Sequence, residues 1–189
     1  FKNHNLTRKP AYSVSQLGIG RSYQKTNIFP EFTCWQNCWL GAQSSLSTSM
    51  RFIKPAKKYK TVHQQTEKAI ALCDLEGRVD TLASELSYGE QRQLEISMML
   101  ATDPELLLLD EPLGGMGMSE TQKMIGLIKR LASDRTIILI EHDMEAVFAL
   151  ADTLTVMVNG KILATGLPDE IRNSQPVRDA YLGSMKHDQ

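Results

Sequence analysis

Two adjacent carboxylates, Asp110 and Glu111, follow four consecutive leucines, Leu106 to Leu109. An unbroken apolar run of this length predicts a strand of a parallel sheet that is buried on both faces. In open α/β sheets, ligands bind at the carboxyl ends of such strands. Carboxylates placed there can hold Mg²⁺ and orient an attacking water, two requirements of phosphoryl transfer. The alternative is a strand followed by an ordinary acidic turn.

A second group of polar residues precedes an apolar helical stretch. Ser87 and Glu90 have the spacing of a capping box, which predicts that a helix begins there. The unpaired amides and positive dipole end of a helix N-terminus attract anions. Gly89 allows close approach to the backbone, and the Ser87 hydroxyl can donate to a phosphate. The alternative is that Ser87 only caps its helix.

Two further polar residues complete the set. His142 follows a second apolar run, Ile137 to Ile140, after Glu141, and Gln24 ends the segment Gly18 to Gln24. A lone histidine at a strand end is usually a satisfied polar group, and a lone glutamine has no specificity. Their value lies in their order and spacing relative to the two carboxylates.

In this order and spacing, the four segments resemble the nucleotide-binding domain of ABC transporters. The resemblance places the Q-loop at Gln24, the signature at Leu86 to Glu90, the Walker B motif at Leu106 to Glu111, and the switch histidine at His142. Five segments further resemble the ATPase subunits of importers for branched-chain amino acids, and their relatives for amides and urea: Gly18 to Gln24, Ile28 to Pro30, Leu86 to Ile96, Ile140 to Met144, and Ala180 to Gly183.

This resemblance implies the fold and its organisation. The fold class is α/β, with a P-loop NTPase-like core in which helices flank a parallel sheet and a helical subdomain carries the signature. Residues 1–189 would form a partial ABC ATPase domain. Its parts would be a Q-loop and helical subdomain (about 25–102), a core from Walker B to the switch histidine (about 103–166), and a helical tail (167–189).

The resemblance also implies a role for each site residue on the catalytic side. Asp110 would bind Mg²⁺ through water, with Gln24 approaching the metal and the attacking water. Glu111 would act as general base, and His142 would contact the terminal phosphate of ATP.

The signature would act on a second subunit. Ser87, Tyr88, Gly89 and Glu90 would contact the nucleotide held by that subunit, which could be identical or different. Further expected partners are transmembrane permease subunits and, indirectly, a solute-binding protein, which places the chain in the cytoplasm on the inner face of the plasma membrane.

A P-loop of the form G-x-x-x-x-G-K-[ST] does not occur in the sequence. The one Gly-Lys pair, Gly160-Lys161, is followed by Ile162 and has Thr155 where the first glycine is required. Because the family carries its P-loop upstream of the Q-loop, we expect an amino-terminally truncated domain without its β-subdomain and P-loop, with little activity alone. Two alternatives remain: a non-hydrolysing partner-binding module, and an ABC ATPase that works outside transport.

Composition sets outer limits. The chain has 189 residues, 42% hydrophobic and 23% charged, which is typical of a globular domain. Its net charge of −1 gives no reason to expect nucleic acid as a partner. Cys34, Cys38 and Cys73 are odd in number and lack companion zinc ligands, so we expect buried or partly buried free thiols.

Local patterns predict the elements of the first half. Residues 1–20 look irregular, with a short strand near Leu17 to Ile19. A helix is expected from Thr33 to Ala42 and another from Thr61 to about Glu76. The segment between them, Gln43 to Lys60, is predicted to be a loop whose basic residues are solvated, although they could instead face anionic lipid.

Two elements are expected in the second half. Ser119 would open a helix with an apolar stripe formed by Met124, Ile125, Ile128 and Leu131. Asn159-Gly160 would form the tight turn of a hairpin between Thr153 to Val158 and Lys161 to Ala164.

Overall fold

The computed structural model describes residues 1–44 and 60–184. The chain forms two compact units, residues 1–141 and residues 142–189. In the part of the chain that is described, no helix is both long and apolar enough to cross a membrane.

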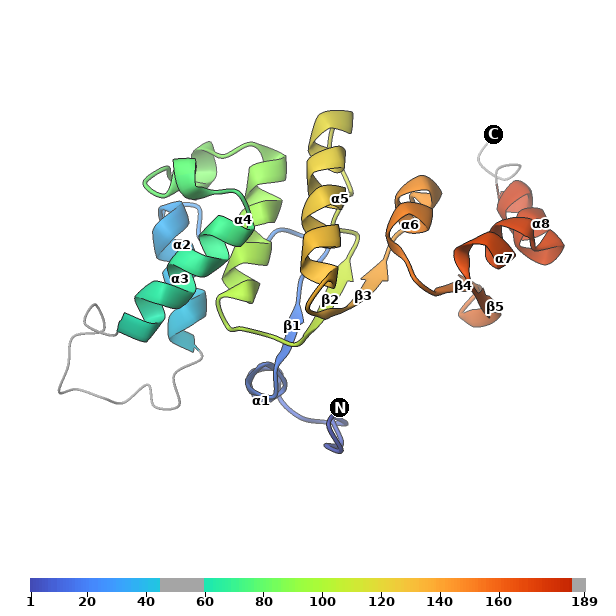
Figure 1. Ribbon diagram of the computed structural model, residues 1–189, viewed down its shortest axis with the longest axis horizontal. Helices are drawn as coiled ribbons and strands as arrows, with labels where there is room; N and C mark the ends of the chain where they lie inside the picture. Colours follow the sequence, from blue (N-terminus) through green and yellow to red (C-terminus); the bar gives the residue numbers. More distant parts are fainter. Residues whose placement is uncertain (45–59, 185–189) are drawn as a thin grey trace. The chain divides into compact units, whose positions relative to one another are not determined.

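A parallel sheet organises the first unit. Its strands are β1 (Ile19–Arg21), β2 (Leu106–Asp110) and β3 (Thr136–Ile140), in the order β1-β2-β3 (Figure 1). The register pairs Ile19 with Leu106 and Asp110 with Ile140, so all three strands end at the same edge. This arrangement of helices and parallel strands confirms the predicted α/β class.

Three helices pack together beside this sheet: α2 (Cys34–Ser44), α3 (Lys60–Leu72) and α4 (Tyr88–Leu100) (Figure 1). Two short 3-10 helices, η2 (Glu76–Arg78) and η3 (Ala83–Glu85), connect α3 to α4. The helices share a buried apolar interior, to which each contributes three residues: Cys34, Cys38 and Ala42; Val62, Ala69 and Ile70; Leu94, Ile96 and Leu100. Burial of these faces, rather than intrinsic helix propensity, supplies most of the stability of such short helices.

One glycine brings two of these helices into backbone contact. A Cβ atom on Gly41 of α2 would lie 2.3 Å from the carbonyl oxygen of Met98 in α4. Backbone cannot move aside as a flexible side chain can, so only glycine fits at this crossing.

The three cysteines are buried free thiols, as predicted. Burial raises the pKa of Cys34 to about 11 and that of Cys38 to about 12, although a hydrogen bond with Ser97 opposes the second shift. Burial also raises the pKa of Cys73 well above its usual value. A raised pKa keeps each thiol protonated, and the thiolate is the reactive form. These cysteines therefore behave as small core residues.

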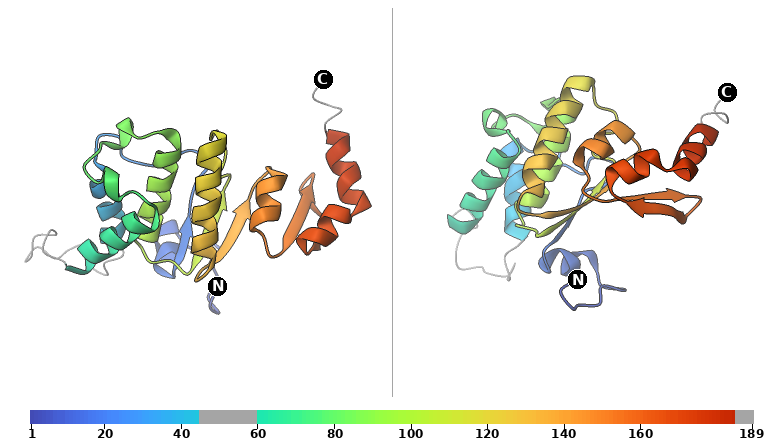
Figure 2. Two further views of the ribbon diagram at one scale, coloured as in Figure 1. Left: turned by 45° about the horizontal axis from the view of Figure 1, so that its top comes forward. Right: turned by 45° about the vertical axis from the view of Figure 1, so that its right-hand side comes forward.

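The other helices in the described part of the first unit are α1 (Ala11–Gln16) and α5 (Met118–Ala132). Helix α5 lies alongside the sheet in each view of Figures 1 and 2. Its buried face consists of Met124, Leu127, Ile128 and Leu131. The predicted stripe was therefore wrong at Ile125, which is only half-buried, and omitted Leu127.

The second unit contains a hairpin and three helices. Strands β4 (Leu154–Val158) and β5 (Lys161–Gly166) pair antiparallel, and helices α6 (Met144–Leu150), α7 (Pro168–Asn173) and α8 (Gln175–Ser184) accompany them. Asn159 and Gly160 both have positive φ, at 49° and 74°, as a type I′ turn requires. This confirms the predicted hairpin. Leu154, Ile171 and Val177 form a small core of this unit.

Several predicted bounds were wrong. Residues 11–16 are helical, and the first strand, predicted near Leu17 to Ile19, spans Ile19 to Arg21. The helix predicted to reach Glu76 ends at Leu72, because Asp74 adopts the left-handed conformation, with a φ of 57°. The helix assigned to Ser119 begins at Met118.

The predicted loop from Gln43 to Lys60 lies largely outside the described residues. Its first two residues belong to α2 and its last to α3. The basic residues Arg51, Lys54, Lys57 and Lys58 fall in the part that is not described.

Burial of the strands also differs from the prediction. In β2, Leu107 and Leu109 are buried, whereas the alternate residues are half-buried. In β3, Ile138 and Ile140 are 53% and 59% exposed. Strand β3 is one of the two edge strands of the described sheet, and these two side chains are exposed.

The contrast between Leu109 and Ile138 predicts unequal costs of truncation. Leu109→Ala should lower the free energy of unfolding by about 2–5 kcal/mol, because it opens a cavity in the core. Ile138→Ala, on the exposed face, should cost less than about 1 kcal/mol, within the range of strand propensities. Urea denaturation of both variants measures the difference. Equal losses would show that the exposed face of β3 is packed in solution.

Candidate functional site

Parallel pairing brings residues far apart in sequence to one edge of the sheet. Asp110 and Glu111 stand at the carboxyl end of β2, and Gln24 follows β1, its neighbour. The Gln24 side chain reaches across, and its Nε2 donates to Glu111 Oε2 at 3.1 Å. The structure thus brings together three of the predicted site residues.

Asp110 is fixed through its backbone. Its amide donates to Ser22 Oγ at 3.2 Å, and the Ser22 amide donates to the carbonyl of Leu108 at 2.9 Å. The Asp110 carboxylate is about one-third exposed, with Arg21 Nη2 at 4.0 Å from Oδ2. The carboxylate therefore faces solvent beside a cation while its backbone is held. Ser22, which is 3% exposed, was not predicted as a site residue.

The backbone turns sharply at Glu111. Its φ is +46°, in the left-handed region that is uncommon for a residue with a side chain. Its amide donates to the carbonyl of Ile140 at 2.9 Å, and two residues later the Leu113 amide donates to Glu141 Oε1 at 2.8 Å. These bonds to and beyond the end of β3 hold a conformation that costs of order 1–3 kcal/mol.

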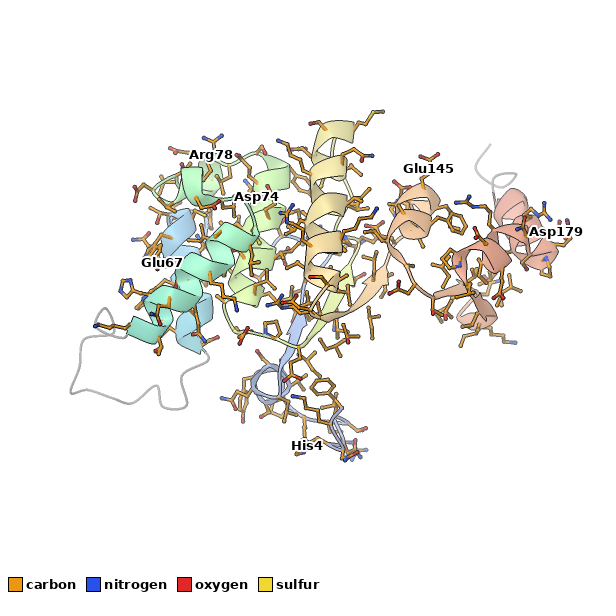
Figure 3. The ribbon with its side chains drawn as sticks, in the orientation of Figure 1. His4, Glu67, Asp74, Arg78, Glu145 and Asp179 are labelled. Carbon is orange, nitrogen blue, oxygen red and sulfur yellow. The ribbon has the colours of Figure 1, made fainter. Side chains whose placement is uncertain are left out.

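The signature segment forms the predicted capping box at the start of α4. Ser87 Oγ accepts from the Glu90 amide at 3.3 Å, and Glu90 Oε2 accepts from the Ser87 amide at 2.9 Å. Arg78 also donates to Glu90 Oε1 at 2.8 Å, and Figure 3 labels Arg78 on the connection between α3 and α4. Partial burial raises the pKa of Glu90, but the bonds from Ser87 and Arg78 outweigh it, so the pKa lies below its usual value.

A carboxylate already occupies the anion position at this helix N-terminus. Glu120 Oε1, from the first turn of α5, accepts from Ser87 Oγ at 3.0 Å and from the Gly89 amide at 3.2 Å. The bonds from Ser87, Gly117 and Gly89 lower the pKa of Glu120. The predicted anion site is therefore formed, with a side chain of the same chain as its anion.

A cavity of about 270 Å³ adjoins this contact. Two carboxylates and two cations are among its lining residues: Arg78, Ser87, Gly89, Glu90, Gln93, Glu120, Lys123 and Met124. The sequence patterns did not point to Glu120 or Lys123. An acidic residue in the first turn of a helix indicates only a favourable dipole interaction.

Tyr88 links the signature to the loop after Glu111. Its side chain is 41% exposed, and a Cβ atom on Gly115 would lie 3.2 Å from its ring. Gly115 has a φ of +77°, so a side chain there would be strained as well as crowded.

His142 is the first residue of the second unit. Beside it, Asp143 caps α6 by accepting from the Glu145 and Ala146 amides at 3.0 and 3.1 Å. His142 and Glu111 belong to different units, so the contact of His142 with the terminal phosphate of ATP stays a prediction.

Comparison with known proteins defines the class. The ABC transporter family model matches residues 1–114, and a model for branched-chain amino acid ATP-binding cassette transporters matches residues 161–187. A crystal structure of an ATP-binding cassette of an ABC transporter in its ADP conformation is 26% identical, with a TM-score of 0.80 over 97% of this chain and 75% of that one. A nucleotide-free cassette is 27% identical, with a TM-score of 0.79 over 96% and 75% of the two chains.

The fold and site thus define an ABC-type ATP-binding domain. Named relatives narrow the group. The high-affinity branched-chain amino acid transport ATP-binding protein LivG of Salmonella typhimurium is 33% identical over 97% of this chain and 74% of its own length. BraF of Pseudomonas aeruginosa, with the same description, is 33% identical over 92% of this chain and 71% of its own length. The chain belongs to the ATP-binding domains of ABC transporters and is close to LivG and BraF.

The bonds to Glu120 predict a pH-dependent stability difference. A carboxylate with a lowered folded pKa stabilises the native state above its unfolded pKa, ordinarily 4.5, and that stability is lost as pH falls through the folded pKa. Glu120→Gln mimics the protonated form. Wild type should therefore melt above the variant at pH 7, and the gap should shrink below pH 4.5.

Thermal unfolding followed by circular dichroism from pH 7 to pH 3 measures this gap. Glu67→Gln, at an exposed position on α3, controls for the loss of one charge (Figure 3). A gap for Glu120→Gln that stays constant over this range would contradict the assignment.

Proposed function

We propose that the chain is part of the ATP-hydrolysing subunit of an importer for branched-chain amino acids. ATP would close a dimer of two such subunits, identical or different, and hydrolysis would reopen it to drive the permease. The names of LivG and BraF and the match of residues 161–187 support the choice of substrate class. A solute-binding protein would bind the amino acid before these steps.

The observation that carries the proposal is the meeting of Gln24, Asp110 and Glu111 at one edge of the sheet. In the proposed mechanism, Glu111 acts as the general base that takes a proton from the attacking water. Gln24, hydrogen-bonded to Glu111, orients that water. His142 would donate to the terminal phosphate, an assignment that rests on its position in the sequence.

The donors at this edge fit Mg²⁺. Asp110 offers a partly exposed carboxylate and Gln24 an amide, and hard oxygen donors of this kind suit a cation that retains part of its hydration shell. Among the described residues, no group of three or more His, Cys, Asp or Glu side chains could hold a metal. Asp110, acting through water, and Gln24 would be completed by phosphate oxygens and further water molecules. Bound Mg²⁺ would neutralise charge on the phosphates.

The signature residues would serve the nucleotide of the second subunit. The Ser87 hydroxyl and the Gly89 amide are directed at one anion, Glu90 lines the adjoining cavity, and Tyr88 stands between Ser87 and Gly89 in the sequence. A phosphate would have to replace the Glu120 carboxylate there, since both need the same two donors. In the absence of ATP, the Glu120 carboxylate keeps these two donors hydrogen-bonded.

The proposed location follows from the proposed partners. An ATPase subunit that drives permease subunits works at the cytoplasmic, inner face of the plasma membrane, where it attaches through them. Gln24 and its loop would lie toward those subunits.

Replacement of the general base should separate binding from hydrolysis. In the transporter assembled in its own membrane, Glu111→Gln should retain ATP binding and dimerisation and lose hydrolysis by about 10²–10⁴-fold, the usual contribution of general base catalysis. Phosphate release and nucleotide binding measure the two steps. Glu105→Gln, at an exposed position just before β2, is the matched control. Turnover of Glu111→Gln near the parental rate would refute the assignment.

The 189-residue chain itself should release little phosphate from ATP, because it contains no P-loop motif to cradle the phosphates. Its Glu111→Gln variant supplies the blank for this assay. Robust turnover by the chain that disappears in the variant would contradict the expectation.

A further inference from the structure

A buried ion pair in α4 holds the backbone at Gln24. Arg92 is 3% exposed and Glu95 is 7% exposed, and Arg92 Nη1 donates to Glu95 Oε2 at 3.0 Å. The same Nη1 donates to the carbonyl of Tyr23 at 2.7 Å, and Nη2 donates to the carbonyl of Gln24. The ion pair therefore hydrogen-bonds the backbone of the segment that follows β1.

Glu95 completes the grip from the other side. Its Oε1 accepts from the Tyr23 amide at 3.3 Å. The Tyr23 amide, the Tyr23 carbonyl and the Gln24 carbonyl are thus all hydrogen-bonded to one pair of side chains. The side chain of the second residue, Gln24, makes the bond to Glu111 Oε2. The Gln24 side chain therefore connects the Arg92–Glu95 pair, here called the clamp, to the proposed general base.

The energetics point to position rather than stability as the benefit. A buried ion pair recovers its desolvation cost only with excellent geometry, and apolar residues of similar size often serve stability as well. The planar guanidinium of arginine offers several donors in a fixed fork, whereas lysine presents a single flexible ammonium. Two carbonyls and a carboxylate accept from the two Nη atoms of Arg92, whereas its buried Nε makes no hydrogen bond.

We propose that Arg92 and Glu95 are positioning residues for ATP hydrolysis, which hold Gln24 in contact with Glu111. The inference rests on the proposed function. It also assigns α4 two tasks, since its N-cap and first turn carry Ser87 and Gly89 and its next turn carries the clamp.

Arg92→Lys tests the clamp in the transporter assembled in its own membrane. Because the clamp acts on geometry, kcat for ATP hydrolysis should fall by about 10–100-fold, as expected for small misplacements near reacting groups. KM for ATP should change by less than about threefold, since no direct nucleotide contact is removed. Arg130→Lys is the matched control, because Arg130 also bonds a carboxylate and a carbonyl, on an exposed surface.

Glu95→Gln provides a graded second variant. It leaves Arg92 its two carbonyl acceptors and keeps an oxygen for the Tyr23 amide, so kcat should fall less than in Arg92→Lys. This variant also tests the clamp if Arg92→Lys does not fold. Unchanged kcat in both variants, or a rise in KM alone, would overturn the inference.

Hydrogen exchange of the 189-residue chain separates positioning from general stability. In Arg92→Lys the Tyr23 amide should exchange at least about tenfold faster, while the amides of β2 keep their protection. Faster exchange throughout α4 and β2 would mean a purely structural role. Glu111→Gln in the same ATPase assay keeps the two proposals distinct: if it turns over normally, the proposed function fails, and if only the clamp variants are normal, this inference alone fails.

Discussion

Parallel pairing of β1 with β2 is the constraint on which the site depends. It places Gln24 beside Glu111, 87 residues later in the chain. The described part of the intervening chain contains the packed helices α2, α3 and α4, so strand pairing rather than a short connection creates that proximity. Ser22 reinforces the pairing by accepting from the Asp110 amide, so the same contacts that hold the strands together also orient the carboxylates.

Helix α4 connects the functions of the first unit. Its N-terminus presents donors to an anion, its next turn grips the chain after β1, and its later residues enter the core of the helical cluster. A change at the N-terminus can therefore reach Gln24 through one turn of α4 and the hydrogen bonds of Arg92. The Glu120 carboxylate adds a link to α5, so replacement of this carboxylate by another anion would affect both α4 and α5.

Much of this arrangement could be predicted from sequence, because some signals are local. The capping box at Ser87 and the Asn-Gly turn at Gly160 specify their own geometry within four residues. Likewise, an apolar run that ends in Asp110 indicates a strand end. Contacts between distant residues were beyond such signals: nothing near Glu120 announces that its carboxylate meets Ser87, 33 residues earlier. Exposure of Ile138 was also missed, because an apolar run does not say which of its faces the rest of the fold covers.

The close approach at Gly41 has a mechanical consequence. Elsewhere in a core, side-chain rotation can absorb a small displacement between neighbouring helices. Where the Met98 carbonyl meets Gly41, no side chain lies between the two backbones to yield. A displacement of α4 of even a fraction of an ångström must then displace α2 as well, so the two helices move as one rigid body.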